Sequence, residues 1–197
     1  APRRESVLAG FKAVDSEIVL RSLAITAVVV NHVSDWVVGG GAQVLILLAG
    51  YNLARYQRIR YFSGNGFDVL LSFIGRIIAP YYLILVSYFI FKRKLDVPSL
   101  LMISNYFGRF RSLIEPFWFL EALLQCMIVL TVLMSLPGLR RIAERDPWRF
   151  GLGLLAAAIA VKVAVAATFS NEHLLSRTVD AVFFFLALGW CVQQANT

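Results

Sequence analysis

The sequence predicts an all-α membrane protein, a polytopic transmembrane helix bundle, and three observations lead to that prediction. Of the 197 residues, 59% are hydrophobic and only 16% are charged. The mean hydropathy of +0.71 is high for a soluble domain, because a chain of this size has more apolar side chains than one core can bury. The apolar residues also gather in runs close to the ~20 residues that a helix needs to cross a bilayer.

We expect about six spans in this chain, in a single membrane-embedded domain over residues 1–197. In order, the candidates are Ile18 to Val38, Ala42 to Tyr56, Val69 to Phe91, Phe117 to Leu136, Phe150 to Phe169 and Thr178 to Val192. The second is short, so it reaches the interface only if Arg55 and Arg58 extend toward the lipid headgroups. The third contains Pro80, whose ring removes a backbone hydrogen bond and predicts a kink.

The net charge of +7 would point to nucleic acid in a soluble protein. Here the basic residues lie mainly in short segments between apolar runs, so no nucleic-acid partner is expected. Two basic connections contain Arg55, Arg58, Arg60, Arg140, Arg141, Arg145 and Arg149. The positive-inside rule places these connections, and with them the N-terminus, on the cytoplasmic side of the cell membrane. The cluster Lys92, Arg93, Lys94 then falls on the outer side, in conflict with the rule.

Two polar side chains, Arg21 and His32, interrupt the first apolar run. Eleven helical steps of ~100° and ~1.5 Å make about three turns, which puts both side chains on one face roughly 16 Å apart. A charge inside a membrane costs at least a few kcal/mol and normally faces a polar cavity or a substrate. The pair therefore predicts a polar groove within the membrane.

The segments RSLAITAVVVNHVSDW and GGGAQVLILLAGYNLAR resemble the opening of the acyltransferase-3 family of polytopic membrane O-acyltransferases. In that family the first span holds an Arg or Lys, ten residues and a His. The second span often has Ser-Gly-Phe where this chain has Ala49, Gly50 and Tyr51. Arg76 before IIAPYY is similar to a basic motif of the family's third span, although Ala79 stands where a second Arg is common. EPFWFLEALLQC resembles the family's Trp-Phe-Leu span.

The resemblance implies an acyltransferase, transferring groups other than aminoacyl groups, that moves an acyl group, commonly acetyl, from acyl-CoA to a hydroxyl of a cell-envelope carbohydrate or glycolipid. Acyl-CoA is then a donor substrate, and no bound cofactor is expected. No metal site is expected, because Cys126 and Cys191 lie inside apolar runs without ligand spacing. Family members usually have about ten spans, and this chain stops at Thr197 directly after an apolar run, so we expect a partial chain truncated at its C-terminus.

His32 is the candidate general base, because imidazole exchanges protons near neutral pH and can take the proton of an acceptor hydroxyl. Asp35, three positions on, is the candidate that orients the ring; the alternative is a solvated carboxylate at the helix end. Arg21 and Arg76 are candidates for binding the donor, since guanidinium groups suit phosphate, and the resemblance implies the same role. The alternative for each is that it only extends to the membrane interface.

Glu121 is costly in lipid unless it is protonated or paired, so we expect it to face the bundle interior, as a substrate contact or as the partner of an arginine. The alternative to an enzyme is a polytopic transporter or a non-catalytic scaffold subunit, in which the intramembrane charges line a permeation path or bind a partner helix. Transporters often have paired, interrupted spans in two related halves. This sequence shows no such internal repeat.

Overall fold

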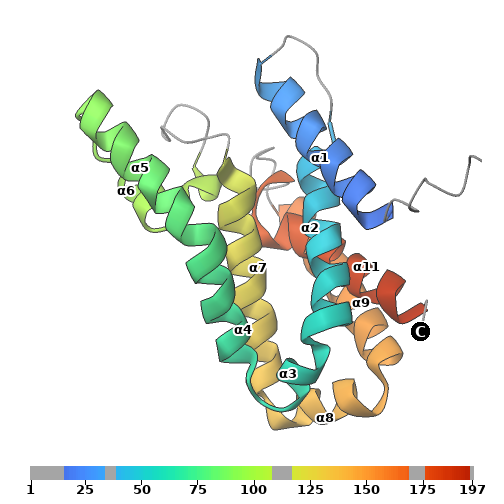
Figure 1. Ribbon diagram of the computed structural model, residues 1–197. Helices are drawn as coiled ribbons and strands as arrows, with labels where there is room; N and C mark the ends of the chain where they lie inside the picture. Colours follow the sequence, from blue (N-terminus) through green and yellow to red (C-terminus); the bar gives the residue numbers. More distant parts are fainter. Residues whose placement is uncertain (1–15, 34–38, 108–116, 169–175, 196–197) are drawn as a thin grey trace, which may run out of the picture. The chain divides into compact units, whose positions relative to one another are not determined.

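The computed structural model describes residues 16–33, 39–107, 117–168 and 176–195, and these ranges contain helices and no β-strand (Figure 1). The all-α class is therefore confirmed for the described residues. The helices are α1 (Ser16–Val33), α2 (Gly41–Asn52), η2 (Leu53–Gln57), α3 (Arg58–Phe62), α4 (Gly66–Phe73), η3 (Ile74–Ile78), α5 (Ala79–Lys92), α6 (Val97–Leu100), η4 (Ser104–Tyr106), α7 (Trp118–Ser135), α8 (Pro137–Arg145), α9 (Pro147–Thr168) and α11 (Val179–Ala195). Of these, η2 and η3 are π-helical turns and η4 is a 3₁₀ turn.

Among the described residues, four helices are long and apolar enough to cross a membrane, so the expected count of about six is not confirmed. These four are Ser16–Val33, Gly66–Lys92, Trp118–Ser135 and Pro147–Thr168. The expected span from Ala42 to Tyr56 lies in a helix that continues through η2 and α3 and carries three arginines near its end. The last candidate corresponds to α11, which is apolar but has only 17 residues.

The chain divides into two compact units, residues 1–45 and 46–197. In the first unit, α1 meets the beginning of α2 at Gly41. A Cβ atom on Gly41 would lie 2.7 Å from the carbonyl oxygen of Ala24 and 2.9 Å from Cγ2 of Val28. Ala24 is buried at this contact. A residue without a side chain is therefore needed where the two helices approach.

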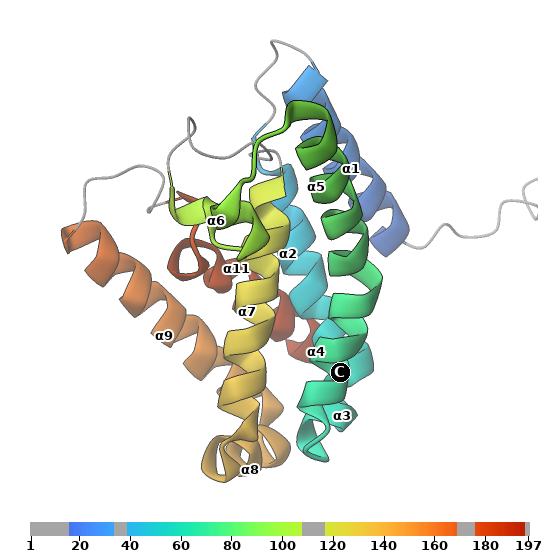
Figure 2. The same ribbon diagram turned by 90° about the vertical axis from the view of Figure 1, so that its left-hand side faces the viewer.

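The second unit contains the long helix Gly66–Lys92, which packs against α7 (Figures 1 and 2). Its middle is the π turn η3, in which the backbone N–H of Ala79 donates to the carbonyl oxygen of Ile74, five residues earlier. The turn lies directly before Pro80, whose ring would clash with the carbonyl group four residues earlier in a regular α-helix. The discontinuity expected at Pro80 thus takes the form of a wider turn, after which the helix continues.

The helices α2 and α11 cross with their backbones in direct contact. A Cβ atom on Gly50 would overlap the carbonyl oxygen of Leu186, and one on Gly189 would overlap the carbonyl oxygen of Leu47. Small residues at a crossing let membrane helices approach closely, so that van der Waals contact and backbone packing hold them together. This crossing fixes α11, which also packs along α9.

After Lys92 the chain turns back along α5 in a return segment, residues 93–107, that includes α6 and η4. The turn begins at Arg93, which has a φ of 52° and ends α5 in the left-handed conformation. The Tyr81 hydroxyl lies 3.1 Å from the carbonyl oxygen of Ser99, and the Tyr82 hydroxyl donates to that of Leu100 at 2.9 Å. Since Tyr81 precedes Lys92 by eleven residues, the chain returns roughly 16 Å along the helix.

Candidate functional site

The first candidate pair lies on α1, which is a continuous α-helix from Ser16 to Val33. With ~100° per residue, Arg21 and His32 are about 20° apart around this helix, so they share a face as predicted. The guanidinium of Arg21 is already paired: its Nη2 lies 2.7 Å from Oε1 of Glu17. This ion pair was not among the predicted contacts, although a spacing of four residues on a helix is its usual signal.

The predicted catalytic side chains sit at the end of α1 and beyond it. His32 lies in the last turn of α1, and its side chain is exposed. Asp35 lies outside the described residues, so its role in orienting the imidazole stays a prediction. The imidazole is thus placed by a regular helix, while its expected partner belongs to the segment that follows.

Arg76 lies within the π turn η3, in the middle of the long helix Gly66–Lys92, and its side chain is exposed. Among the described residues its guanidinium has no hydrogen-bond or ion-pair partner. An arginine at this depth is costly in lipid unless it faces a polar cavity or ligand, and π turns are frequent at functional sites. Arg21 belongs to the other compact unit, so a donor site shared by both arginines stays a prediction.

Glu121 lies in the first turn of α7 and is fully buried. Its Oε1 accepts hydrogen bonds from the hydroxyls of Tyr81 at 2.8 Å and Ser104 at 2.7 Å. Its Oε2 accepts one from the backbone N–H of Asn105 at 3.0 Å. These three donors come from α5 and the return segment, and none is an arginine. The carboxylate therefore binds protein groups, and the substrate contact expected of it stays a prediction.

A pair of amide side chains extends this polar cluster. Asn105 Nδ2 donates to Oε1 of Gln125 at 3.1 Å, and Gln125 Nε2 donates back to Oδ1 of Asn105 at 3.0 Å. Gln125 Nε2 also donates to the carbonyl oxygen of Met102 at 2.7 Å, and Asn105 Nδ2 to that of Arg177 at 3.1 Å. Backbone outside regular helices is tolerated at membrane depth only where protein or a polar cavity satisfies it. We call Tyr81, Ser104, Asn105, Glu121 and Gln125 the Glu121 cluster.

The Glu121 cluster thus has a clear structural role, because it supplies partners to a return segment that lies beside α5 and contains only short helical turns. Glu121 was predicted from the sequence as a candidate site residue, and the other four members of the cluster were not. Ser104 and Asn105 give a weak signal, because such side chains are also common in surface loops, whereas Gln125 stands inside a predicted span and could have been noticed as a buried polar residue.

Another polar contact ties α3 to α11 near the basic end of the second unit. Arg58 Nη1 donates to Oε1 of Gln194 at 2.8 Å, and the guanidinium of Arg55 stacks over the ring of Tyr56, 5.0 Å from its centroid. Arg58 is therefore held by a protein group, whereas its extension toward the headgroups was the condition for the second expected span to reach the interface. No group of three or more His, Cys, Asp or Glu side chains that could hold a metal occurs among the described residues.

Comparisons with protein-family models, with curated proteins and with solved structures give no significant match to this chain.

Proposed function

We propose that this chain forms part of a membrane acyltransferase that moves an acyl group, acetyl being the expected one, from acyl-CoA to a hydroxyl of a cell-envelope carbohydrate or glycolipid. The observation that carries the proposal is the arrangement on α1, where Arg21 and His32 share one face of a single helix roughly 16 Å apart. A cation that holds phosphate and a base that accepts a proton, aligned in this way, suit a long carrier molecule with a reactive thioester at its end.

In this mechanism His32 removes the proton of the acceptor hydroxyl as the hydroxyl oxygen attacks the thioester carbonyl carbon. The tetrahedral intermediate collapses with cleavage of the carbon–sulfur bond, the new ester forms, and the leaving thiolate takes the proton that His32 removed from the hydroxyl, which regenerates the base. Asp35 orients the imidazole through a hydrogen bond. Arg21 and Arg76 bind the donor phosphates, and Glu17 neutralises Arg21 until the donor arrives.

The apolar helices support a location in the membrane. The four long helices are compatible with an integral membrane protein, whose bilayer partner is the cell membrane in this proposal. With the N-terminus on the cytoplasmic side, the Arg21 end of α1 would be the end closer to the cytoplasm, where acyl-CoA is available. Arg76 supports the same role through its exposed, unpaired guanidinium at the π turn.

The test measures transfer of a labelled acetyl group to carbohydrate by the full-length protein in its membrane. Membranes containing the wild-type protein or His32→Ala are supplied with acetyl-CoA labelled in the acetyl group, and label is followed into the carbohydrate fraction. Because a general base contributes about 10²- to 10⁴-fold, we expect the variant to lose at least about a hundredfold in rate with unchanged expression. His173→Ala, at the chain's other histidine, is the matched control. Unchanged turnover by His32→Ala would remove the assignment.

A transport assay separates the alternative. If wild-type vesicles transport a solute without transferring any label, the chain is a transporter and not an acyltransferase. If neither activity occurs while a partner protein co-purifies, the chain is a scaffold subunit.

A further inference from the structure

The short helix α8 connects two candidate spans, α7 and α9, and packs against α3 at one end of the second unit (Figures 1 and 2). Its inward side is marked by the buried Ala143. At ~100° per residue, Arg141 and Arg145 both lie at least about 160° from Ala143 around the helix. The two guanidinium groups therefore leave α8 on the side facing away from the bundle, and both side chains are exposed.

The acidic residues nearby are already used by other arginines. Arg140 pairs with Glu144 at 3.8 Å, and Arg149 pairs with Asp146 at 3.1 Å. Among the described residues Arg141 and Arg145 have no ion-pair or hydrogen-bond partner. Because they are four residues apart on one helix face, their positive charges repel each other. An anion from outside the chain would remove that repulsion.

A third arginine belongs to the same end of the unit. Arg60 of α3 is exposed and likewise has no side-chain partner in the described part of the chain. The turn after α3 touches α8 directly, since a Cβ atom on Gly64 would lie 2.7 Å from Nη1 of Arg140. Arg60, Arg141 and Arg145 thus belong to two helices that pack together, and we call these three residues the basic surface.

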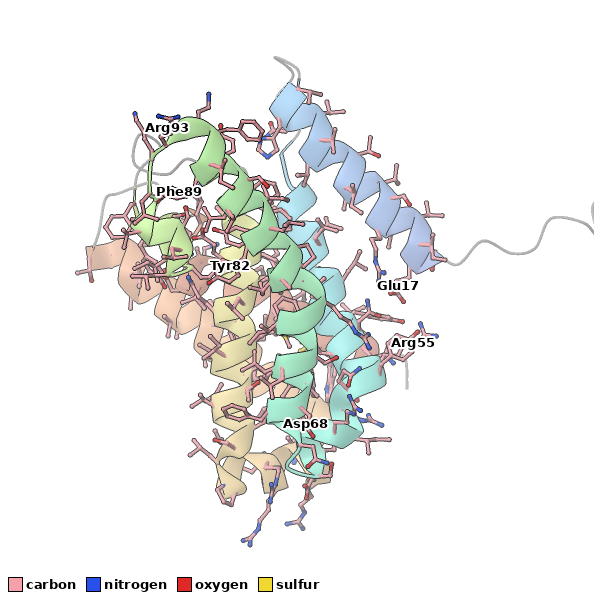
Figure 3. All side chains as sticks on the ribbon, turned by 60° about the vertical axis from the view of Figure 1, so that its left-hand side comes forward. Glu17, Arg55, Asp68, Tyr82, Phe89 and Arg93 are labelled. Carbon is pink, nitrogen blue, oxygen red and sulfur yellow. The ribbon has the colours of Figure 1, made fainter. Side chains whose placement is uncertain are left out.

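The length of the neighbouring helix sets the level of this surface in a bilayer. The helix Gly66–Lys92 has 27 residues and is therefore about 40 Å long, close to the ~40–45 Å thickness of a bilayer with its headgroup regions. Figure 3 shows Asp68 and Arg93 toward opposite ends of this helix. The turn between α3 and α4 therefore lies at headgroup level. Trp148, 41% exposed at the start of α9, is of the residue type that favours this layer.

We propose that Arg60, Arg141 and Arg145 form a binding surface for the phosphate of anionic phospholipid headgroups. Guanidinium groups bind phosphate oxygens through paired hydrogen bonds. An anionic headgroup also brings a net negative charge, which a zwitterionic headgroup lacks, so the surface discriminates between them. The exposed Ile142 on the flank of α8 and Trp148 contact the upper part of the acyl chains. This binding does not depend on acyl transfer.

The test is a lipid titration of the full chain in a non-ionic detergent. Fluorescent short-chain phosphatidylglycerol and phosphatidylcholine are titrated separately, and we expect phosphatidylglycerol to bind at least about 25-fold more tightly. Each basic side chain near an anionic membrane surface contributes a factor of about five to the binding affinity. Arg141→Gln with Arg145→Gln is therefore expected to weaken phosphatidylglycerol binding about 25-fold and to leave phosphatidylcholine binding unchanged. Raising the salt from about 0.05 to about 0.5 M should weaken the same interaction.

Two matched variants keep the test decisive. Arg141→Lys with Arg145→Lys keeps both charges but not the paired hydrogen bonds, so it should lose clearly less affinity than the Gln variant, which shows that the further loss in the Gln variant is due to charge and not to misfolding. Lys92→Gln with Lys94→Gln removes the same charge from the other end of the long helix and should change nothing. Equal binding of both lipids, equal loss in the Lys92 and Lys94 variant, or displacement of the lipid by micromolar inorganic pyrophosphate would each overturn the proposal.

Discussion

Tyr81 of α5 and Glu121 of α7 are joined by a hydrogen bond of 2.8 Å between the phenol hydroxyl and Oε1 of the carboxylate, and both side chains are buried. This contact lies where the return segment reaches the middle of the long helix. It therefore links three parts of the chain that the sequence separates by up to 40 residues.

Tyr81→Phe should lower the free energy of unfolding by about 1–3 kcal/mol, because it removes a hydrogen-bond donor from a fully buried carboxyl group. Thermal unfolding of the detergent-solubilised chain measures the change. Tyr82→Phe is the control, since the Tyr82 hydroxyl donates to a backbone carbonyl at an exposed position and should contribute only about 1 kcal/mol or less. Equal losses in both variants would contradict a special role for the Glu121 cluster.

Gly50→Ala and Gly189→Ala should each destabilise the second unit by about 1–3 kcal/mol or more, because the added methyl group overlaps a backbone carbonyl that cannot move aside. Gly153→Ala in α9 is the control, because a Cβ atom there meets nothing within 4 Å. That variant should be neutral or more stable by up to about 1 kcal/mol through helix propensity. Unfolding midpoints compare the three, and an unchanged Gly50→Ala would refute the close crossing.

Glu17→Gln tests the ion pair on α1 together with the proposed donor role of Arg21. The carboxylate competes with donor phosphate for the guanidinium, and an exposed pair of this kind is worth about 0.2–1 kcal/mol. The KM for acyl-CoA should therefore fall by up to about fivefold with kcat retained, measured in the label-transfer assay. Glu144→Gln, which removes an acid paired with Arg140, should leave KM unchanged. A higher KM in Glu17→Gln would mean that the pair positions Arg21 for binding.

Stability should also depend on pH through Tyr61 of α3. Burial raises the pKa of its phenol above the ordinary value of 10.0, and the hydrogen bond with Thr131 opposes this only in part. The folded chain thus keeps this proton to higher pH than the unfolded chain, so stability falls as pH rises above about 10. Tyr61→Phe should make that decline shallower, by up to about 1.4 kcal/mol per pH unit for one proton. Parallel declines in urea unfolding of both proteins would exclude the effect.

The sequence predicts the long helices well, because the apolar length needed to cross a bilayer is a local property. The run from Val69 to Phe91 appears as Gly66–Lys92, and the run from Phe117 to Leu136 as Trp118–Ser135. The second expected span is different, since its helix continues into residues that carry several arginines. Whether a helix can cross a membrane therefore depends on its length and on its charged residues as well as on its apolar residues.

The candidate site was predictable only where it depends on one helix. The shared face of Arg21 and His32 follows from helical geometry, and the pairing with Glu17 was readable from the same spacing. The Glu121 cluster was not, because the partners of Glu121 lie 16 to 40 residues away and meet it only after the return segment folds back. Contacts of that range depend on tertiary packing, for which one sequence carries no local signal.

The backbone crossing at Gly50 and Gly189 has a mechanical consequence. No side chain separates the two backbones, so α2 and α11 cannot come closer or move apart by a change of side-chain rotamer. The hydrogen bond from Arg58 to Gln194 holds α3 against α11 beyond the crossing, so α11 is attached at two separate points to the continuous helical segment that contains α2 and α3.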